Sequence, residues 1–418
     1  MANHLIGLLL GTEEDWPSAF EAMVRRTGGG ISYEGDMHTF STERITHEPF
    51  DLRTVPRHSL VIDRLAHWYS LSREWTKKVA LMDKVYLLNS PFTFQAMEKH
   101  SAYCAMIRLG LKVPATWMIP HKVGPKDERY PYTSSRYAQQ FDLGAIADEI
   151  GYPFFMKPFD GGAWVGVTRI SSPEQLKRSY DESGQRLMHL QASVENFDVF
   201  ARSLSIGAET IVMRFEPERP MYDRYQVEHG FLAADTGVEV VTIGKLVNAF
   251  FRWEFNSCET LIKDGEVYPI DYANAAPDVS ITSLHYYFPW AIKTLLKWSI
   301  FCCVTDRKMR IDQDTARYFE IGDREDLSYE EKLEEYRKLA DNFFQAERYD
   351  EFCGKHLHGI DEAMVEFIES QEFDGILVDT VRSTFPTHEH DKFIGHYRGL
   401  LGAWAADQYR STKGIEPS

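Results

Sequence analysis

The stretch that most constrains the fold runs from Pro153 to Val167, PFFMKPFDGGAWVGV. An apolar segment passes through Lys157 and a proline into a turn containing Gly161 and Gly162, and a second apolar segment follows. This pattern predicts a β-hairpin. Glycines let backbone N–H groups approach an anion closely, and a lysine at the strand end adds positive charge. The hairpin therefore predicts a phosphate site suited to a nucleotide triphosphate, with a plain turn beside a lysine as the alternative.

Length, charge and cysteine content limit the classes of function. The 418 residues suffice for two or three domains, and 44% hydrophobic with 26% charged residues is typical of soluble globular proteins. A net charge of −17 argues against binding to nucleic acid or an anionic membrane, because both depend on clustered Lys and Arg. Five cysteines form no C-x-x-C pair and no zinc spacing, which favours a reducing, cytosolic compartment.

No apolar stretch predicts a membrane segment. The run Leu5 to Leu10 is too short for a signal sequence, lacks a basic lead and is followed by acidic residues, so it predicts a buried strand. The longer stretch Leu284 to Val304 is interrupted by a histidine and two lysines. It predicts a core helix, with docking of a partner subunit as the less favoured alternative.

Residues 1 to 90 alternate strand-like and helix-like segments. This order predicts a small parallel sheet with helices on its faces. Neither G-x-G-x-x-G after the first strand nor a P-loop motif occurs. The expected strands are Ile6–Leu10, Ser59–Asp63 and Val85–Leu88, and the expected helices are Trp16–Arg25 and Trp68–Met82.

Residues 91 to 283 mix further strands and helices, and helices dominate afterwards. A helix from about Phe94 to Leu109 carries Lys99, and the polar stretch Pro120–Arg136 predicts a surface insertion. Ser328 and Glu331 form a capping box in the C-terminal part. The other expected strands are Val113–Ile119, Met188–Gln191, Val199–Ile206, Phe255–Ile262 and Val267–Ile270. A metal site formed by His356, His358, His388, His390 and His396 is a minor alternative.

Several motifs in one order carry a family resemblance. They are Lys99 before GLKVPAT, the hairpin GYPFFMKPFDGGAWVGV, HLQ followed by Asp198 and Arg202, and then Glu259 with Asp271 and Asn274. Over residues 80 to 280 the chain resembles the ATP-grasp superfamily of carboxylate–amine ligases, such as D-alanine–D-alanine ligases, glutathione synthetase and RimK-type ligases.

The resemblance implies an α/β (α+β) fold with a parallel α/β domain over residues 1–90 and an ATP-grasp domain over 91–283. Residues 284–418 match no part of the family, and their helical pattern predicts a helical C-terminal extension. Within the grasp domain, a small lid subdomain would span about 121–190 and a catalytic subdomain about 191–283.

The resemblance also implies which residues bind ATP. Lys99 and Lys157 would neutralise the α- and β-phosphates, beside Gly161 and Gly162. Met188–Gln191 would be a hinge strand whose backbone reads the adenine. The remaining residues implied in nucleotide binding are His189, Leu190, Gln191, Asp198 on the ribose hydroxyls, and Arg202; pairing of Asp198 with Arg202 is the alternative.

Magnesium is implied by the acidic hairpin that follows. Glu259, Asp271 and Asn274 would supply oxygen ligands, which Mg²⁺ prefers. Similar ligases have Glu-x-Asn on the second strand, whereas this chain has Asp271-Tyr-Ala-Asn274. Either a bulge brings Asp271 to the ion, or Asp278 or water takes its place.

The implied reaction joins a small-molecule or peptide carboxylate to an amine. The carboxylate attacks the γ-phosphate to give an acyl phosphate and ADP, and the amine then attacks the acyl carbon. A cation must stabilise the oxyanion, for which Arg214, Arg224 and Arg252 are the catalytic candidates. An ATP-dependent kinase and a non-catalytic ATP-binding scaffold are the alternatives. Substrate identity and homo-oligomer formation are left open.

Overall fold

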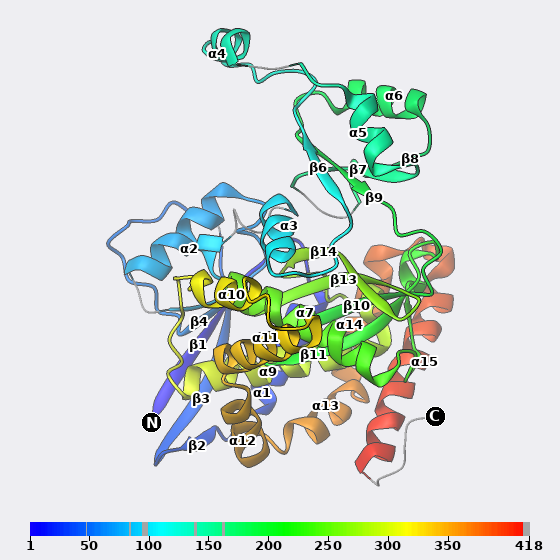
Figure 1. The fold of residues 1–418 in the computed structure, drawn as a ribbon. Helices are drawn as coiled ribbons and strands as arrows, with labels where there is room; N and C mark the ends of the chain where they lie inside the picture. Colours follow the sequence, from blue (N-terminus) through cyan, green and yellow to red (C-terminus); the bar gives the residue numbers. More distant parts are fainter. Residues whose placement is uncertain (47, 83–84, 94–98, 138–139, 161–163, 413–418) are drawn as a thin grey trace.

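The computed structural model describes residues 1–46, 48–82, 85–93, 99–137, 140–160 and 164–412. Its strands form three sheets, with orders β2-β3-β1-β4-β5, β6-β9-β7-β8 and β12-β11-β10-β13-β14. Figure 1 shows the small second sheet standing away from a larger body that contains the other two. The predicted mixed α/β fold with a helical C-terminal region is confirmed.

The N-terminal sheet is parallel, as predicted, apart from its edge strand. Strand β1 pairs in parallel with β3 and β4, and β4 pairs with β5, whereas β2 is antiparallel to β3. Strands β2 and β3 lie in a segment for which the sequence pattern gives no prediction. The elements are β1 (Ala2–Leu9), α1 (Asp15–Arg26), β2 (Ile31–Tyr33), β3 (Asp36–Arg44), β4 (Leu60–Asp63), α2 (Ser70–Met82) and β5 (Tyr86–Leu88).

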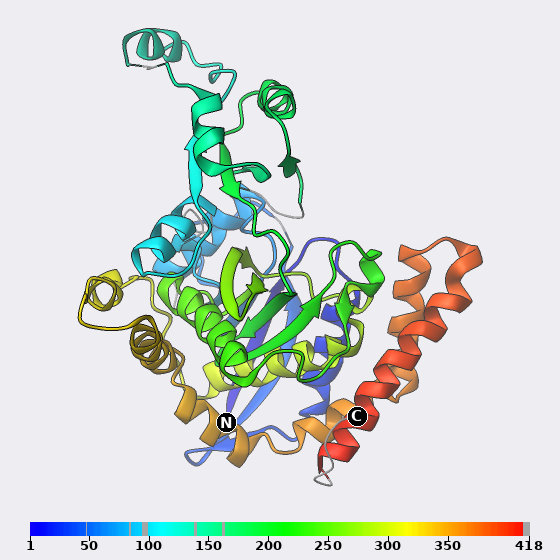
Figure 2. The same cartoon turned by 45° about the vertical axis from the view of Figure 1, so that its right-hand side comes forward.

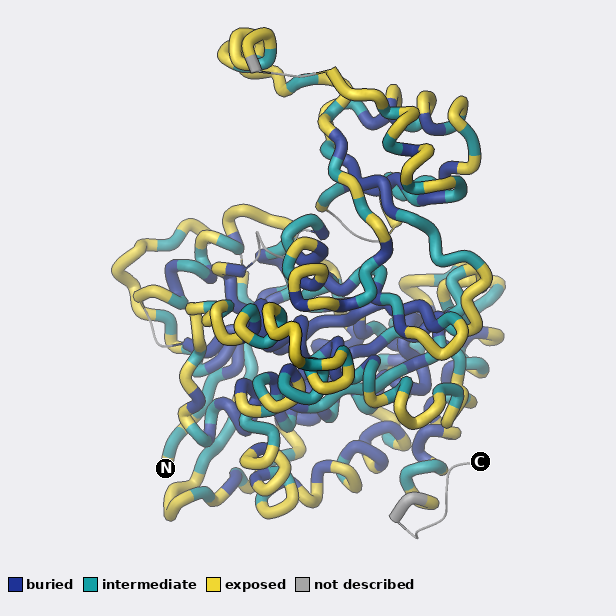
Figure 3. Tube along the Cα trace, viewed as in Figure 1, coloured by how far each residue is buried: buried dark blue, intermediate teal, exposed yellow. Residues whose placement is uncertain are grey.

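The four-stranded sheet is antiparallel throughout and includes the predicted hairpin. Strands β7 and β8 pair as predicted, and Ser172 caps the following helix by accepting a hydrogen bond from Gln175 N. The predicted surface insertion contains a short exposed helix, α4 (Figure 3). The elements are β6 (Thr116–Ile119), α4 (Tyr130–Tyr137), α5 (Leu143–Ile150), β7 (Phe154–Pro158), β8 (Thr168–Ile170), α6 (Pro173–Ser183) and β9 (Met188–Ala192).

The third sheet is antiparallel and has helix α7 on one face. Gly244 of α7 lies against Ser203 and Ser205, so α7 covers the face to which these side chains point. The neighbouring residues along the strand, Phe200 and Arg202, point to the other face because side chains alternate. The elements are α3 (Lys99–Arg108), β10 (Val199–Ile206), β11 (Glu209–Phe215), β12 (Tyr225–Gln226), α7 (Ala234–Phe251), β13 (Phe255–Lys263) and β14 (Glu266–Ala275).

The C-terminal helices share the core of the body. Helix α9 packs against α1, β4 and β10, and it is buried along nearly its whole length, so the predicted core helix is confirmed. Figure 2 shows the last helices packed along the body beside the third sheet. The elements are α8 (Ile281–Leu284), α9 (Phe288–Val304), α10 (Thr315–Gly322), α11 (Tyr329–Phe344), α12 (Ala346–His356), α13 (Ile360–Ile368), α14 (Gln371–Thr384) and α15 (His390–Thr412). The capping box of Ser328 and Glu331 is present at α11.

Candidate nucleotide site

One cavity of about 920 Å³ lies where the three sheets meet. Its walls come from the four-stranded sheet, from the segment after β4 and from the face of the third sheet opposite α7. Such a volume is typical of small-molecule sites. The sequence-predicted residues that line it are Lys99, Lys157, Gln191, Arg202, Arg224, Glu259, Asp271 and Asn274.

Two buried lysines meet in this cavity. Lys99 begins α3, and its Nζ lies 2.5 Å from Asp271 Oδ2. Lys157, on β7, donates from Nζ to Gln191 Oε1 at 2.6 Å and to Ile270 O at 3.2 Å. Burial lowers the pKa of Lys157 to about 8, an effect that Asp271 partly offsets. These ammonium groups are placed to attract an anion into the cavity.

The hairpin β13–β14 is irregular where the carboxylates lie. Ser257 pairs with Asn274, whereas Glu259 pairs with Asp271, so β14 has an extra residue between the two pairs. This is a β-bulge, and it places Asp271 opposite Glu259. The sequence leaves open whether a bulge, Asp278 or water completes the metal site, and the structure contains the bulge.

Both carboxylates are electrostatically perturbed. Burial and then the charge of Asp271 raise the pKa of Glu259. Burial acts in the same direction on Asp271, but Lys99 and Lys157 together outweigh it and lower the pKa of Asp271. Asp271 Oδ1 is buried and has no hydrogen-bond partner within the described residues. A buried, unpartnered carboxylate oxygen beside a second carboxylate suits a cation.

The donor set fits Mg²⁺ accompanied by phosphate. Asn274 donates from Nδ2 to Ser257 O at 3.3 Å, which leaves its amide oxygen for a ligand. Across the described ranges, no group of three or more His, Cys, Asp or Glu side chains could hold a metal ion, the C-terminal histidines included. Two carboxylates and an amide oxygen leave positions for phosphate and water, as is common for Mg²⁺.

The backbone of Met188–Gln191, which was expected to read adenine, lies in the middle of the four-stranded sheet. Strand β9 is central, with β6 on one side and β7 on the other, so both ladders use the backbone groups of His189 and Leu190. The last of these bonds runs from Ala192 N to Ala115 O at 2.8 Å. Strand pairing therefore uses the backbone that was expected to read adenine. Of this stretch only Gln191 lines the cavity, together with the residues that follow it, 192–197.

The side chain of His189, on β9, contacts helix α3. Its Nε2 lies 3.3 Å from Nδ1 of His100 on α3, and the two rings are stacked. Burial, followed by the charges of His100, Lys157 and Lys99, lowers the pKa of His189 to about 3, so its ring is neutral near pH 7.

Asp198 does not line the cavity. Asp198 accepts a hydrogen bond from Asp264 N at 2.8 Å, across the turn between β13 and β14. The alternative pairing of Asp198 with Arg202 is also absent from the described contacts, since Arg202 pairs with Glu259 at 3.6 Å. Gly161 and Gly162 lie outside the described residues.

Only one of the three arginine candidates lines the cavity. Arg224 is half-buried there, donates from Nε to Arg219 O at 3.1 Å, and forms no ion pair with any described carboxylate. Arg214 lies on the α7 face of the sheet and pairs with Glu216 and Glu228.

Arg252 has a structural position outside the cavity. Its guanidinium donates to three backbone carbonyls, those of Ala249, Asp312 and Gln313, at the end of α7. These bonds correct the expectation of a catalytic role: a buried arginine that satisfies a helix end is not available to a substrate.

The N-terminal domain supplies cavity residues that no motif indicated. Arg64, His67 and Trp68 follow β4, where Asp63 accepts two backbone hydrogen bonds at 2.9 Å and so fixes the turn. Ligands of open α/β sheets bind at the carboxyl ends of parallel strands, and this general rule is the signal that could have found these residues. Exposed apolar side chains continue around the rim of the cavity: Trp68, Trp164, Val165, Phe197 and Met221.

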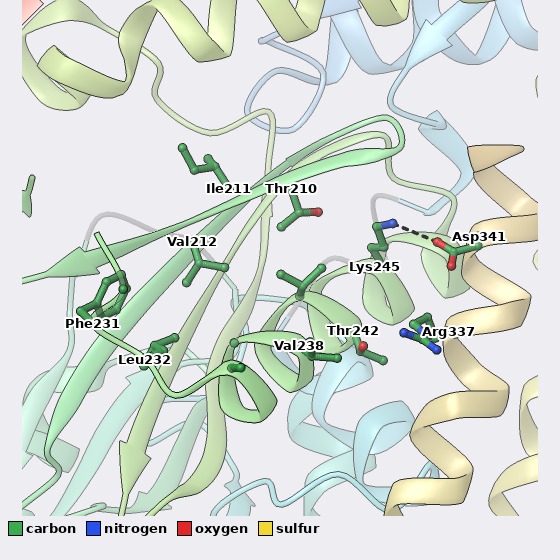
Figure 4. A pocket seen from close by; sticks show the side chains of 14 residues that line it. Thr210, Ile211, Val212, Phe231, Leu232, Val238, Thr242, Lys245, Arg337 and Asp341 are labelled. Carbon is green, nitrogen blue, oxygen red and sulfur yellow. Dashed lines mark hydrogen bonds and ion pairs between the residues drawn. The ribbon is translucent and has the colours of Figure 1, made fainter. Parts of the chain in front are cut away.

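A second cavity of about 620 Å³ shares no residue with the first. It lies on the α7 face of the third sheet, between β11, α7 and α11 (Figure 4). Its walls are mainly apolar, and the ion pair between Lys245 Nζ and Asp341 Oδ1, 2.9 Å long, lies at one end.

Comparison by sequence finds no relative, since neither a protein-family model nor a curated protein matches this chain. Solved structures do match. One is an ATP-grasp RimK domain protein from Sphaerobacter thermophilus, with 12% identity over 73% of this chain and 100% of that chain, at a TM-score of 0.49.

Two further solved structures match this chain, one of a ligase and one of a macrocyclase. A D-alanine–D-alanine ligase from Bacillus anthracis complexed with ATP has 11% identity over 83% of this chain and 99% of its own, at a TM-score of 0.44. The macrocyclase MdnC from Microcystis aeruginosa, bound with precursor peptide MdnA, has 10% identity over 70% and 98%, at a TM-score of 0.46.

None of the helices in the described residues combines the length and the apolar character needed to span a bilayer.

Proposed function

We propose that the protein is an ATP-dependent ligase that joins a carboxylate to an amine through an acyl phosphate. The observation that carries this proposal is the meeting of two buried lysines with the buried carboxylate of Glu259 and the half-buried carboxylate of Asp271 in one cavity, from elements far apart in the chain. Cations for a polyphosphate beside oxygen ligands for Mg²⁺ are the parts that phosphoryl transfer requires.

The nucleotide would lie between the four-stranded sheet and the third sheet. Lys99 and Lys157 would bind its phosphates, and Arg202, whose Nε is buried without a described partner, would add a third cation. We place the adenine against residues 193–197, because the backbone after Ala192 is released from both ladders. The contacts of Asp198 with the ribose and of Gly161 and Gly162 with the phosphates remain proposals that rest on the family resemblance alone.

Glu259, Asp271 and Asn274 would hold Mg²⁺. When bound, the ion would offset phosphate charge. Lys99 holds Asp271 in place through its 2.5 Å contact, and the bulge sets Glu259 opposite. The protein's contribution is therefore to fix these oxygen ligands in a buried site before the nucleotide enters.

The acyl transfer would use the substrate end of the cavity. A substrate carboxylate oxygen attacks the γ-phosphorus, the bond to the β-phosphate oxygen breaks, and ADP leaves. An amine nitrogen then attacks the acyl carbon, and phosphate leaves with the bonding electrons. Arg224 is the candidate for stabilising the oxyanion, since it lines the cavity and has no described carboxylate partner.

The reaction can be tested without knowing the substrates. The protein is incubated with Mg-ATP and pooled carboxylic acids and amines, and ADP release is measured with each pool alone and with both. We expect release that requires both pools, and transfer of ¹⁸O from labelled carboxylates into phosphate. A stable phosphorylated product would indicate a kinase, and nucleotide binding without turnover would indicate a scaffold.

We also propose the partners and the cellular compartment of this activity. The expected partners are a small-molecule or peptide carboxylate and an amine, and not nucleic acid or membrane. All five cysteines are free. Free thiols are typical of a reducing compartment, so we place the activity in the cytoplasm.

A further inference from the structure

Strand β11 has a free edge beside the second cavity. The two-residue strand β12 pairs only with Arg214 and Phe215, whereas β10 pairs with β11 along its opposite side from Glu209 to Arg214. The rest of the outer edge, from Glu209 to Met213, has no strand beside it in the described chain.

The direction of the free backbone groups follows from one hydrogen bond. Glu216 N donates to Arg224 O at 2.8 Å, so the backbone of Glu216 points toward the β12 side. The register with β10 is regular, and alternate residues of a strand point to the same edge. The backbone N–H and C=O groups of Val212 and Thr210 therefore face the free edge, where no contact of the described residues uses them.

This edge lacks the usual protection against pairing. Edge strands are normally guarded by proline, by charged side chains or by a bulge. Here the only charged residue of the free part is Glu209 at its end, which pairs with Lys297, and Thr210-Ile-Val212 is strongly β-forming, uncharged and regular. Beside it the cavity has apolar walls, including Leu232 and Val238, and Val238 is 54% exposed (Figure 4).

We propose that the second cavity binds an extended peptide, which adds a strand to the free edge of β11. The backbone of the peptide would bond to Thr210 and Val212, and an apolar side chain would enter the cavity against Val238. A peptide is the occupant that fits, because only an extended backbone repeats N–H and C=O groups at the spacing of a strand. The paired Lys245 and Asp341 close the groove at one end.

The proposal does not depend on the ligase reaction. The two cavities share no residue, and they lie on opposite faces of the third sheet. The site would let the protein hold a peptide or a peptide segment of a partner while the nucleotide cavity remains accessible.

Backbone methylation tests the binding mode. The probes are labelled seven-residue peptides in which Thr alternates with Val, Leu, Ile or Phe, and binding to the full chain is measured by fluorescence anisotropy. Strand addition uses the N–H groups of alternate peptide residues only. We therefore expect N-methylation of one alternate set to weaken binding at least tenfold, and methylation of the other set to change it less than threefold.

A matched pair of variants tests the location. Val238→Lys should weaken peptide binding at least tenfold, whereas Val227→Lys should leave it unchanged, since Val227 is 40% exposed and does not line the cavity. The proposal is overturned if no peptide of the panel binds saturably, if both methylated sets behave alike, or if both variants bind like the natural protein. A dimer that Val238→Lys converts to monomer would also overturn it, by assigning the edge to a second copy.

Discussion

Lys157 titrates close to neutral pH, and this gives the proposed ATP site a pH dependence. Its pKa is lowered to about 8, so the ammonium form is present below that pH and is lost above it. Phosphate binds the ammonium form, so Mg-ATP affinity should fall roughly five- to tenfold between pH 7 and 9. Calorimetric titration at both pH values measures this fall. In Lys157→Met the fall should disappear, and an unchanged fall would assign the titration to another group.

The two carboxylates should be needed for magnesium-dependent turnover. Glu259→Gln and Asp271→Asn each remove the negative charge of a proposed Mg²⁺ ligand. We expect the rate of ADP release at fixed Mg²⁺ to fall at least about 100-fold in each variant. Asp326→Asn serves as the control, because Asp326 is an exposed carboxylate that pairs with Arg324 and does not line the cavity. Turnover that survives in both cavity variants would remove these residues from the metal site.

Individual residues could be predicted from the sequence where a motif fixes them. Lys99, Lys157, Glu259 and Asp271 were expected together, and the structure brings them to one cavity. The structural role of Arg252 could not be predicted from the sequence. Two of its three carbonyl partners, those of Asp312 and Gln313, lie in a loop far along the chain, and no local pattern connects them to Arg252.

At the scale of elements, Asn89 joins the N-terminal sheet to the start of β13. Its Oδ1 accepts hydrogen bonds from Glu254 N and Phe255 N, and its Nδ2 donates to Phe255 O at 2.8 Å. Asn89→Ala would leave these buried groups unpaired, and we expect the free energy of unfolding to fall by about 2–4 kcal/mol. Urea unfolding measures it, with the exposed Asn3→Ala as control. Equal stability of the two variants would contradict this role.

Strands and helices of the body were largely predictable, because apolar periodicity and caps are local signals. The neighbours of a strand are not local. The pattern of Met188–Gln191 predicts a strand correctly, but it carries no sign that β6 and β7 flank β9 and use its backbone. The same limit applies to Arg64, His67 and Trp68, which follow β4. They line the cavity because of the order of the strands in the sheet, and the sequence around them does not indicate that order.

At the scale of the whole molecule, a buried network joins all three predicted parts. Arg307 donates to Glu254 Oε1 at 3.0 Å, to Tyr86 OH at 2.7 Å and to Phe343 O at 2.9 Å. Trp298 Nε1 donates to the other oxygen of Glu254 at 2.8 Å. The helices after residue 283 are thus packed into one core with the domains before them, which the sequence could not indicate because their contacts are long-range.

Removing one member of this network should destabilise the molecule as a whole. Arg307→Met leaves the Glu254 carboxylate buried without its ion pair, and we expect a loss of about 3–5 kcal/mol in the free energy of unfolding. Arg324→Met breaks an exposed pair with Asp326 and should have little effect. The two variants are compared by denaturant unfolding at pH 7. A similar small effect in both would mean that the buried pair does not hold the parts together.

Calorimetric titration of Mg-ATP into the natural protein and into lysine variants tests the proposed ATP site most directly. We expect one bound ATP per chain, an affinity at least about tenfold lower in Lys99→Met and in Lys157→Met, and no change in Lys245→Met at the second cavity. Absence of ATP binding, or equal affinity in all four proteins, would contradict it.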